Sequence, residues 1–283
     1  MATYRYASSQ PFERDDIELV QMFLSQYKDE DGNSYVLKVR PDVEERKAKA
    51  VEAIAVAESG CSLAIEHTYI QPFEGQKSDD VPFLTVFEQL RTDASLRIPN
   101  RFIDVFVPAF ALPKGVDWKE VAKQVRKWFI ESSAKFPVEG ETEYSIPGCG
   151  FELKVMVQTF GLPETDGVVV VGRILPRGDP FDAVLQKALC QKVPKLVAAP
   201  ADKHILLLED GGTAIGFAKI GMCLDKSVEN LPDLKKVDSV WTIHTMEWKS
   251  KGHALFVRVW PGWTRQRFSI EDGRFAKPRP EEA

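Results

Sequence analysis

Hydrophobic and polar positions alternate along the chain in two periods, which predict an interleaved series of helices and strands. Apolar residues three or four positions apart indicate helices, and apolar residues at every second position indicate strands. The helices expected on this basis cover residues 16–24, 43–58, 82–95, 118–132 and 181–193, with a more polar helical segment around 227–236. The expected strands cover residues 35–39, 62–70, 101–110, 150–160, 167–175, 204–209, 237–245 and 254–260.

This order predicts an α/β or α+β protein with a mixed β-sheet flanked by helices, since both hairpins and crossover helices are implied. The run 150–160 and the run 167–175 are separated by a turn-rich loop, and we expect them to pair antiparallel. The nearly continuous apolar run of HILLLED, starting at His204, indicates a central strand buried on both faces. No repeat or linker marks a boundary, so we expect one domain over residues 1–283.

The stretch 61–80, CSLAIEHTYIQPFEGQKSDD, carries the highest density of chemically capable side chains beside an apolar run. It begins as a buried strand with Glu66 and His67 in its middle and continues into a polar segment. Successive strand side chains point to opposite faces, so Glu66 and His67 should face opposite sides of the sheet.

Carboxylates in this region predict a candidate Mg²⁺ site, because Mg²⁺ takes hard oxygen ligands. The candidate metal ligands are acidic residues from the strand, the helix expected before it and the segment after it: Glu66, Glu52 (or Glu45), Asp79 and Asp80. The candidate catalytic residues are Glu66, His67 and Lys77. Two alternatives stay open: Glu66 forms a half-buried ion pair with Lys77 or an arginine, and His67 is a core residue.

The helix and strand over residues 42–70, with the AIEHT sequence, resemble the core of the restriction-endonuclease-like, PD-(D/E)XK, superfamily. The helix 181–193 followed by HILLLED resembles the second helix and fourth strand of that core. The resemblance implies a nuclease that uses a divalent metal held by acids on adjacent strands. Thr68 stands where the family places a lysine, so the resemblance requires Lys77 or Lys49 to supply that charge.

Two other segments allow competing interpretations. Glu152-Leu153-Lys154 is a literal E-x-K tripeptide on an expected strand, which chance alternation also explains. The C-terminal run ALFVRVWPGWTRQRF mixes aromatic residues with arginines, a composition that suits either nucleic-acid binding or a last core strand with solvated arginines.

Composition narrows the function classes. The 37 basic and 42 acidic residues give a net charge of -5, which argues against a basic surface over the whole molecule. The four cysteines are scattered without a CxxC pair, as expected for reduced thiols. No signal-like or membrane-spanning apolar run occurs. We therefore expect a cytoplasmic protein without a membrane partner. P-loop, GxSxG and GxGxxG motifs are also lacking.

Two functions remain open from the sequence. The first is a metal-dependent nuclease with a degenerate active site, with Mg²⁺ as cofactor and nucleic acid as partner. The alternative is a non-catalytic binding or structural protein with a nuclease-like fold, in which the polar residues around Glu66 fix the segment that follows. The missing lysine favours the alternative.

Overall fold

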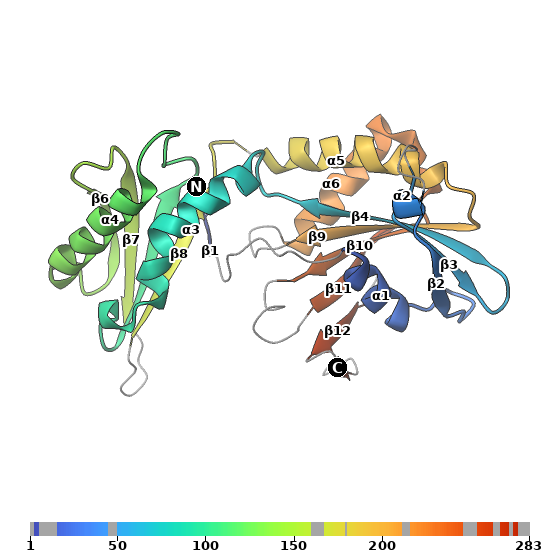
Figure 1. The fold of residues 1–283 in the computed structure, drawn as a ribbon, viewed down its shortest axis with the longest axis horizontal. Helices are drawn as coiled ribbons and strands as arrows, with labels where there is room; N and C mark the ends of the chain where they lie inside the picture. The colour runs from blue at the N-terminus through green and yellow to red at the C-terminus, as the bar shows by residue number, and fades with distance from the viewer. Residues whose placement is uncertain are drawn as a thin grey trace. The chain divides into compact units, whose positions relative to one another are not determined.

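The computed structural model forms two compact units where we expected a single domain (Figure 1). Unit 1 contains Met1–Pro11 and Pro72–Pro180, and unit 2 contains Phe12–Gln71 and Phe181–Ala283. The structure describes residues 3–5, 16–44, 50–159, 167–178, 180–210, 216–245, 254–262, 267–271 and 274–276. Each unit has its own sheet and its own apolar core.

Unit 1 is built on a five-stranded mixed sheet in the order β1-β8-β5-β7-β6. Its strands are β1 (Thr3–Arg5), β5 (Arg101–Pro108), β6 (Gly140–Ser145), β7 (Glu152–Thr159) and β8 (Val168–Ile174). β5 pairs parallel with β8 and antiparallel with β7, so β7 and β8 are not neighbours. The expectation that these two strands pair with each other was therefore wrong, because β5 fills the position between them.

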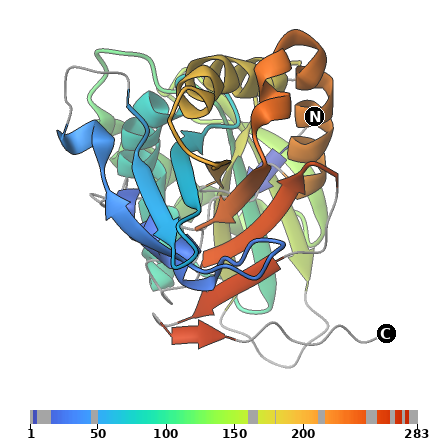
Figure 2. The same cartoon turned by 90° about the vertical axis from the view of Figure 1, so that its right-hand side faces the viewer.

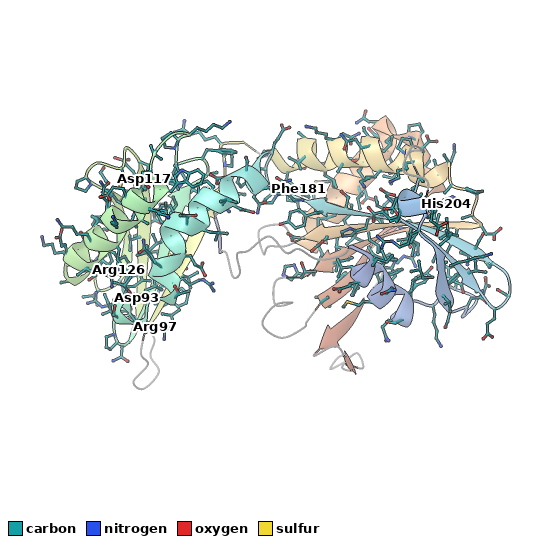
Figure 3. The ribbon with its side chains drawn as sticks, in the orientation of Figure 1. Asp93, Arg97, Asp117, Arg126, Phe181 and His204 are labelled. Carbon is teal, nitrogen blue, oxygen red and sulfur yellow. The ribbon has the colours of Figure 1, made fainter. Side chains whose placement is uncertain are left out.

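Helices α3 (Gln76–Thr92) and α4 (Trp118–Ser132) share an apolar core with one face of this sheet. The core takes alternate residues of β5, β7 and β8, among them Ile103, Val105 and Val155, as the strand period requires. Arg126 of α4 holds Asp93, just after α3, with its Nη2 atom 2.7 Å from the carboxylate; both side chains are labelled in Figure 3. Short 3₁₀ helices, η1 (Ala94–Leu96) and η2 (Ser133–Lys135), follow the two helices.

Unit 2 is built on an eight-stranded mixed sheet in the order β13-β12-β11-β10-β9-β4-β3-β2 (Figure 2). Its strands are β2 (Tyr35–Val39), β3 (Ala53–Ala57), β4 (Ser62–Ile70), β9 (Lys203–Asp210), β10 (Ser239–His244), β11 (Ala254–Trp260), β12 (Arg267–Glu271) and β13 (Arg274–Ala276). β4, β9 and β10 run parallel to one another, and the outer strands are antiparallel. The central, buried position expected for HILLLED is confirmed in β9.

Helices cover both faces of the unit 2 sheet. On one face, α5 (Pro180–Val197) and α6 (Phe217–Asn230) pack against residues such as Leu206 and Leu208, and η3 (Pro232–Lys236) follows α6. On the other face, α1 (Asp16–Gln26) packs against Ile205 and Leu207. α5 continues through Pro194 to Val197, past the end that we expected at residue 193. These two cores bury β9 from both sides and confirm the α/β class with helices flanking a mixed sheet.

The helix expected over residues 43–58 was wrong. Of the residues described in this range, 43 and 44 end the four-residue helix α2 (Pro41–Glu44), and Ala53–Ala57 is strand β3. The alanines at 53, 55 and 57 are all buried towards α1 while the residues between them are partly exposed, which is a strand period. Apolar residues in this segment also recur three or four positions apart, which predicted a helix, but close packing of small side chains on the sheet decided the structure.

Two further corrections concern element boundaries. α3 begins at Gln76, so Asp79 and Asp80 lie in a helix and not in a polar loop. The helix expected near 227–236 ends at Asn230 and begins at Phe217. The C-terminal tail and the aromatic residues at 263 and beyond lie outside the residues whose side chains the structure describes. In the described part of the chain, no helix is both long and apolar enough to traverse a lipid bilayer.

Candidate functional site

Glu66 on β4 is buried completely and faces α5. Its Oε1 atom accepts hydrogen bonds from Lys192 Nζ at 2.6 Å and from Lys195 Nζ at 2.9 Å. The two lysines are three positions apart on α5, and this spacing brings both side chains to one face of the helix. The second oxygen, Oε2, accepts no hydrogen bond from any residue that the structure describes.

Glu52 precedes β3 and joins this group through Lys192, whose Nζ lies 3.5 Å from Glu52 Oε1. Burial lowers the pKa of Lys192, but the hydrogen bond and charge of Glu66, together with the charge of Glu52, more than offset this, so the pKa lies above its ordinary value. Lys192 is therefore a stable cation at neutral pH. We refer to Glu52, Glu66, Lys192 and Lys195 as the Glu66 cluster; its formal charges sum to zero.

His67 lies beside the cluster and on the other face of the sheet, as strand alternation predicts. Glu52 Oε2 accepts a hydrogen bond from the backbone N–H of His67 at 2.9 Å, and His67 Nε2 lies 3.2 Å from Glu209 Oε2. Glu209 also accepts a hydrogen bond from Thr245 Oγ1 at 2.8 Å. His67 is 2% exposed. It is a core residue held between two carboxylates, which matches the second of the two interpretations left open by the sequence.

The donor set of the Glu66 cluster does not fit a Mg²⁺ site as it stands. Two ammonium groups already occupy Oε1 of Glu66, and a divalent cation at this position would meet two positive charges at close range. Among the described residues, no group of three or more histidine, cysteine, aspartate or glutamate side chains is arranged to hold a metal. Glu45, the other acid considered, and Lys49 lie outside the described residues.

Asp79, Asp80 and Lys77 belong to unit 1, whereas Glu52, Glu66 and His67 belong to unit 2. Asp79 and Asp80 hold the fully buried Arg173 of β8, with Arg173 Nε 2.9 Å from Asp79 Oδ2 and Arg173 Nη1 2.8 Å from Asp80 Oδ1. The guanidinium carbon of Arg173 also lies 3.9 Å from the centre of the Phe83 ring. These aspartates stabilise a buried arginine, so the expectation that they serve as metal ligands finds no geometric support. Lys77 is exposed on α3.

The E-x-K tripeptide at 152–154 is a surface feature of β7. Lys154 Nζ lies 2.6 Å from Glu141 on the neighbouring strand β6, and Glu152 accepts a hydrogen bond from Ser145 of the same strand. Both contacts are cross-strand pairs on the exposed edge of the unit 1 sheet. The tripeptide is therefore explained by chance alternation of residues on a strand.

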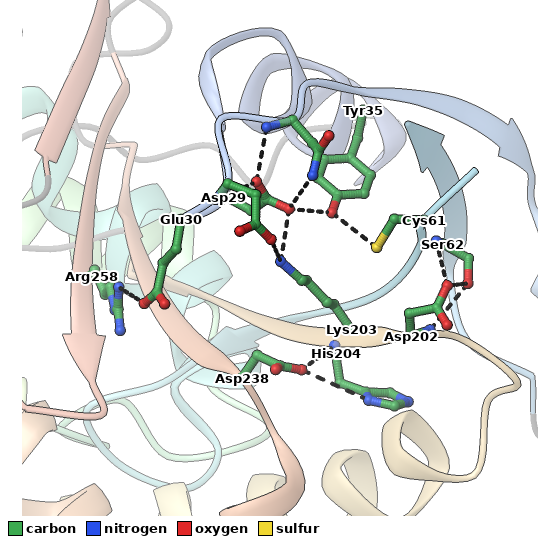
Figure 4. A network of polar contacts seen from close by, with 12 residues as sticks. Asp29, Glu30, Tyr35, Cys61, Ser62, Asp202, Lys203, His204, Asp238 and Arg258 are labelled. Atoms are coloured by element: carbon green, nitrogen blue, oxygen red, sulfur yellow. Dashed lines mark hydrogen bonds and ion pairs between the residues drawn. The ribbon is translucent and has the colours of Figure 1, made fainter. Parts of the chain in front are cut away.

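A second polar network in unit 2 was missed from the sequence (Figure 4). Asp29, whose side chain is 2% exposed, accepts hydrogen bonds from Asn33, Tyr35 and Lys203, with Lys203 Nζ at 2.7 Å. Burial raises the pKa of Asp29, but the hydrogen bonds from Lys203, Asn33 and Tyr35 outweigh it and hold the pKa well below its ordinary range. The only sequence signal was the turn-rich tract KDEDGNS, which suggests a loop and gives no hint of its distant partner Lys203.

Three comparisons, with models of protein families, with curated proteins and with solved structures, found no match to this chain.

Proposed function

We propose that the chain is a non-catalytic binding or structural protein in which the Glu66 cluster locks β3, β4 and α5 together. The observation that carries the proposal is the complete burial of Glu66 with two lysine ammonium groups on one of its oxygens. A charge removed from water needs such partners, because an unpaired buried charge destabilises the fold by several kcal/mol. The charges of the cluster thus balance one another, and the cluster offers no net charge to a ligand.

The distribution of the partners supports a structural role. Glu66 lies on a central strand, Glu52 lies next to the adjacent strand, and both lysines come from a helix more than 120 residues later in the chain. Ion pairs with fixed geometry at such a junction set the register between a helix and a sheet. Removing one partner should therefore loosen α5 from the sheet.

A metal-dependent nuclease with a divergent active site is the second candidate, and one specific observation favours it. Glu66 Oε2 is a buried carboxylate oxygen that no described residue hydrogen-bonds, and Glu52 provides a second carboxylate nearby through Lys192. Lys192 and Lys195 would supply the positive charge that we expected from Lys77 or Lys49. This candidate requires the lysines to give up their contacts with Oε1 when a metal binds.

A cleavage assay separates the two candidates. Purified protein is incubated with single- and double-stranded DNA and RNA in the presence of Mg²⁺ or Mn²⁺, alongside Glu66→Gln and the matched control Glu229→Gln, an exposed glutamate on α6. The proposal expects the same background with all three proteins and no heat of Mg²⁺ binding in calorimetry. Cleavage that needs the metal, survives in Glu229→Gln and disappears in Glu66→Gln would establish the nuclease instead.

A further inference from the structure

Strand β6 forms one edge of the unit 1 sheet and is the most regular of the edge strands (Figure 1). It spans six residues, and its register with β7 is continuous. The other edge strands are shorter: β1 and β13 have three residues each, and the five-residue β2 has a register shift. Among the described strands, none pairs with the outer side of β6. Its outer backbone N–H and C=O groups therefore offer a template for one more strand.

The side chains of β6 alternate between two chemically different faces of the sheet. Thr142 and Tyr144 lie opposite Val155 and Leu153 of β7, whose side chains are buried in the core shared with α3 and α4. The ring of Tyr144 packs against Trp128 of α4, with 5.6 Å between the ring centres. The residues between Thr142 and Tyr144 and on either side of them therefore point to the other face.

This other face of β6 is acidic. Glu141 and Glu143 are both exposed there, and Glu152 of β7 lies on the same face opposite Ser145. Lys154 is the only basic residue of the two strands, and its Nζ atom lies 2.6 Å from Glu141. Glu143 forms no ion pair with any residue that the structure describes. The face therefore carries more carboxylate than ammonium groups, and one carboxylate at the strand edge is unneutralised.

We propose that β6 binds an extended segment of a partner protein in which basic residues alternate with aliphatic ones. The segment adds a strand to the sheet and forms backbone hydrogen bonds with the outer side of β6. Directly opposite side chains on neighbouring strands lie about 5 Å apart at Cβ, so lysine or arginine side chains reach Glu141 and Glu143. The residues between these basic residues lie on the face of Thr142 and Tyr144, where aliphatic side chains cover the tyrosine ring.

Charge argues against a second copy of this chain as the occupant. Two β6 strands paired antiparallel, with their core faces on the same side, would bring the glutamates of one copy against those of the other. Like charges directly opposite each other destabilise a sheet. The acidic side chains thus protect the edge from self-association and attract a basic strand. The inference goes beyond the function proposed above, because β6 belongs to unit 1 and the Glu66 cluster belongs to unit 2.

Fluorescence anisotropy with the full chain tests this inference. The probe is the labelled peptide Lys-Val-Lys-Val-Lys-Val. The controls are Lys-Lys-Lys-Val-Val-Val, which has the same charge without the alternation, and Glu-Val-Glu-Val-Glu-Val, which reverses the charge. The probe is expected to bind about tenfold or more tightly than either control. A probe that does not bind, or that binds no more tightly than Lys-Lys-Lys-Val-Val-Val, would overturn the proposal.

Backbone methylation distinguishes an added strand from other modes of binding. Only every second N–H group of a peptide paired along one edge points towards the sheet. One methylated probe carries N-methyl groups on its lysines, and the other carries them on its valines. One of the two is expected to lose about tenfold or more in affinity through its lost hydrogen bonds, while the other binds like the parent probe. Equal affinities of the two methylated probes would rule out pairing through the strand edge.

Two matched variants locate the binding at β6. Glu143→Lys replaces an attraction by a repulsion directly opposite the bound strand and should lower the affinity for the probe about tenfold. Glu229→Lys, on an exposed position of α6, changes the net charge equally and should leave the affinity unchanged. Equal affinities of the two variants would refute the site. Self-association of the chain alone that Glu143→Lys alters would make a second copy the occupant and would also overturn the proposal.

Discussion

At the scale of single residues, some of the most deeply buried charged side chains form ion pairs with side chains of opposite charge. Arg173, Glu66 and Asp29 have almost no exposed side-chain surface, and each lies against charged partners. None of these partnerships is visible in the sequence, because the partners lie 93 to 174 positions apart along the chain. The sequence did identify Glu66 as an unusual residue, since glutamate is seldom placed within an apolar strand.

Arg173→Met should destabilise unit 1 by about 3–5 kcal/mol, because it leaves Asp79 and Asp80 buried beside an apolar side chain. The lost contact with the Phe83 ring adds to this cost. Urea denaturation followed by circular dichroism measures the change. The control Arg126→Met breaks a half-exposed pair with Asp93 and should cost no more than about 1 kcal/mol. Equal losses in the two variants would show that burial does not distinguish these ion pairs.

Asp29 should make stability depend on acidity. Because its folded-state pKa lies below the value of about 4 in an unfolded chain, its contribution is fully present above about pH 4 and is lost as the pH falls towards the folded-state pKa. Asp29→Asn should therefore be less stable than the wild type at pH 7, and its stability should fall less steeply in acid. Urea midpoints measured from pH 7 down to pH 2 test this, with Asp225→Asn as the exposed control. Parallel curves for the wild type and Asp29→Asn would contradict it.

At the scale of helices and strands, strong periodic patterns were informative and alanine-rich ones were not. β4, β11 and α4 were expected close to their observed bounds because apolar residues recur along them at a strand or helix period, and β9 because its apolar run is nearly continuous. The segment containing β3 alternates small alanines with residues that a helix also accepts, so neither period was distinctive. Lys192 lies on the helix expected over residues 181–193, but Lys195 lies beyond its expected end. The placement of both lysines on one face of α5 therefore depended on the helix continuing through Pro194, which the sequence did not indicate.

The N-terminal cap of α4 should contribute measurably to the free energy of unfolding. Asp117 Oδ1 accepts the backbone N–H groups of Lys119 at 2.9 Å and Glu120 at 3.3 Å, so Asp117 is the N-cap of α4. Asp117→Ala should lower the free energy of unfolding by about 1 kcal/mol, whereas Asp117→Ser retains a capping oxygen and should lose only part of this. Thermal and urea denaturation would measure both. A loss in Asp117→Ser as large as in Asp117→Ala would argue against the cap.

At the scale of the whole molecule, the sequence predicted the class of fold but not its division into two units. The residues of unit 1 interrupt unit 2 between β4 and α5, so the polar segment after Glu66 leads into a different unit from the strand that carries Glu66. Hydrophobic periodicity does not reveal this division. The periodicity reports the type of each local element, whereas the division depends on which elements share a core. The candidate metal site was assembled from residues close together in sequence, and these residues belong to two different units.

The most direct test of the Glu66 cluster as a structural lock is the free energy of unfolding of three proteins: the wild type, Glu66→Ala, and the double variant Glu66→Leu with Lys195→Met. Glu66→Ala leaves two lysines without their shared carboxylate and should cost about 3–5 kcal/mol. The double variant removes one charge of each sign and leaves Lys192 beside Glu52, so it should recover most of that loss. A Glu66→Ala protein as stable as the wild type, or a double variant no better than the single one, would contradict the lock.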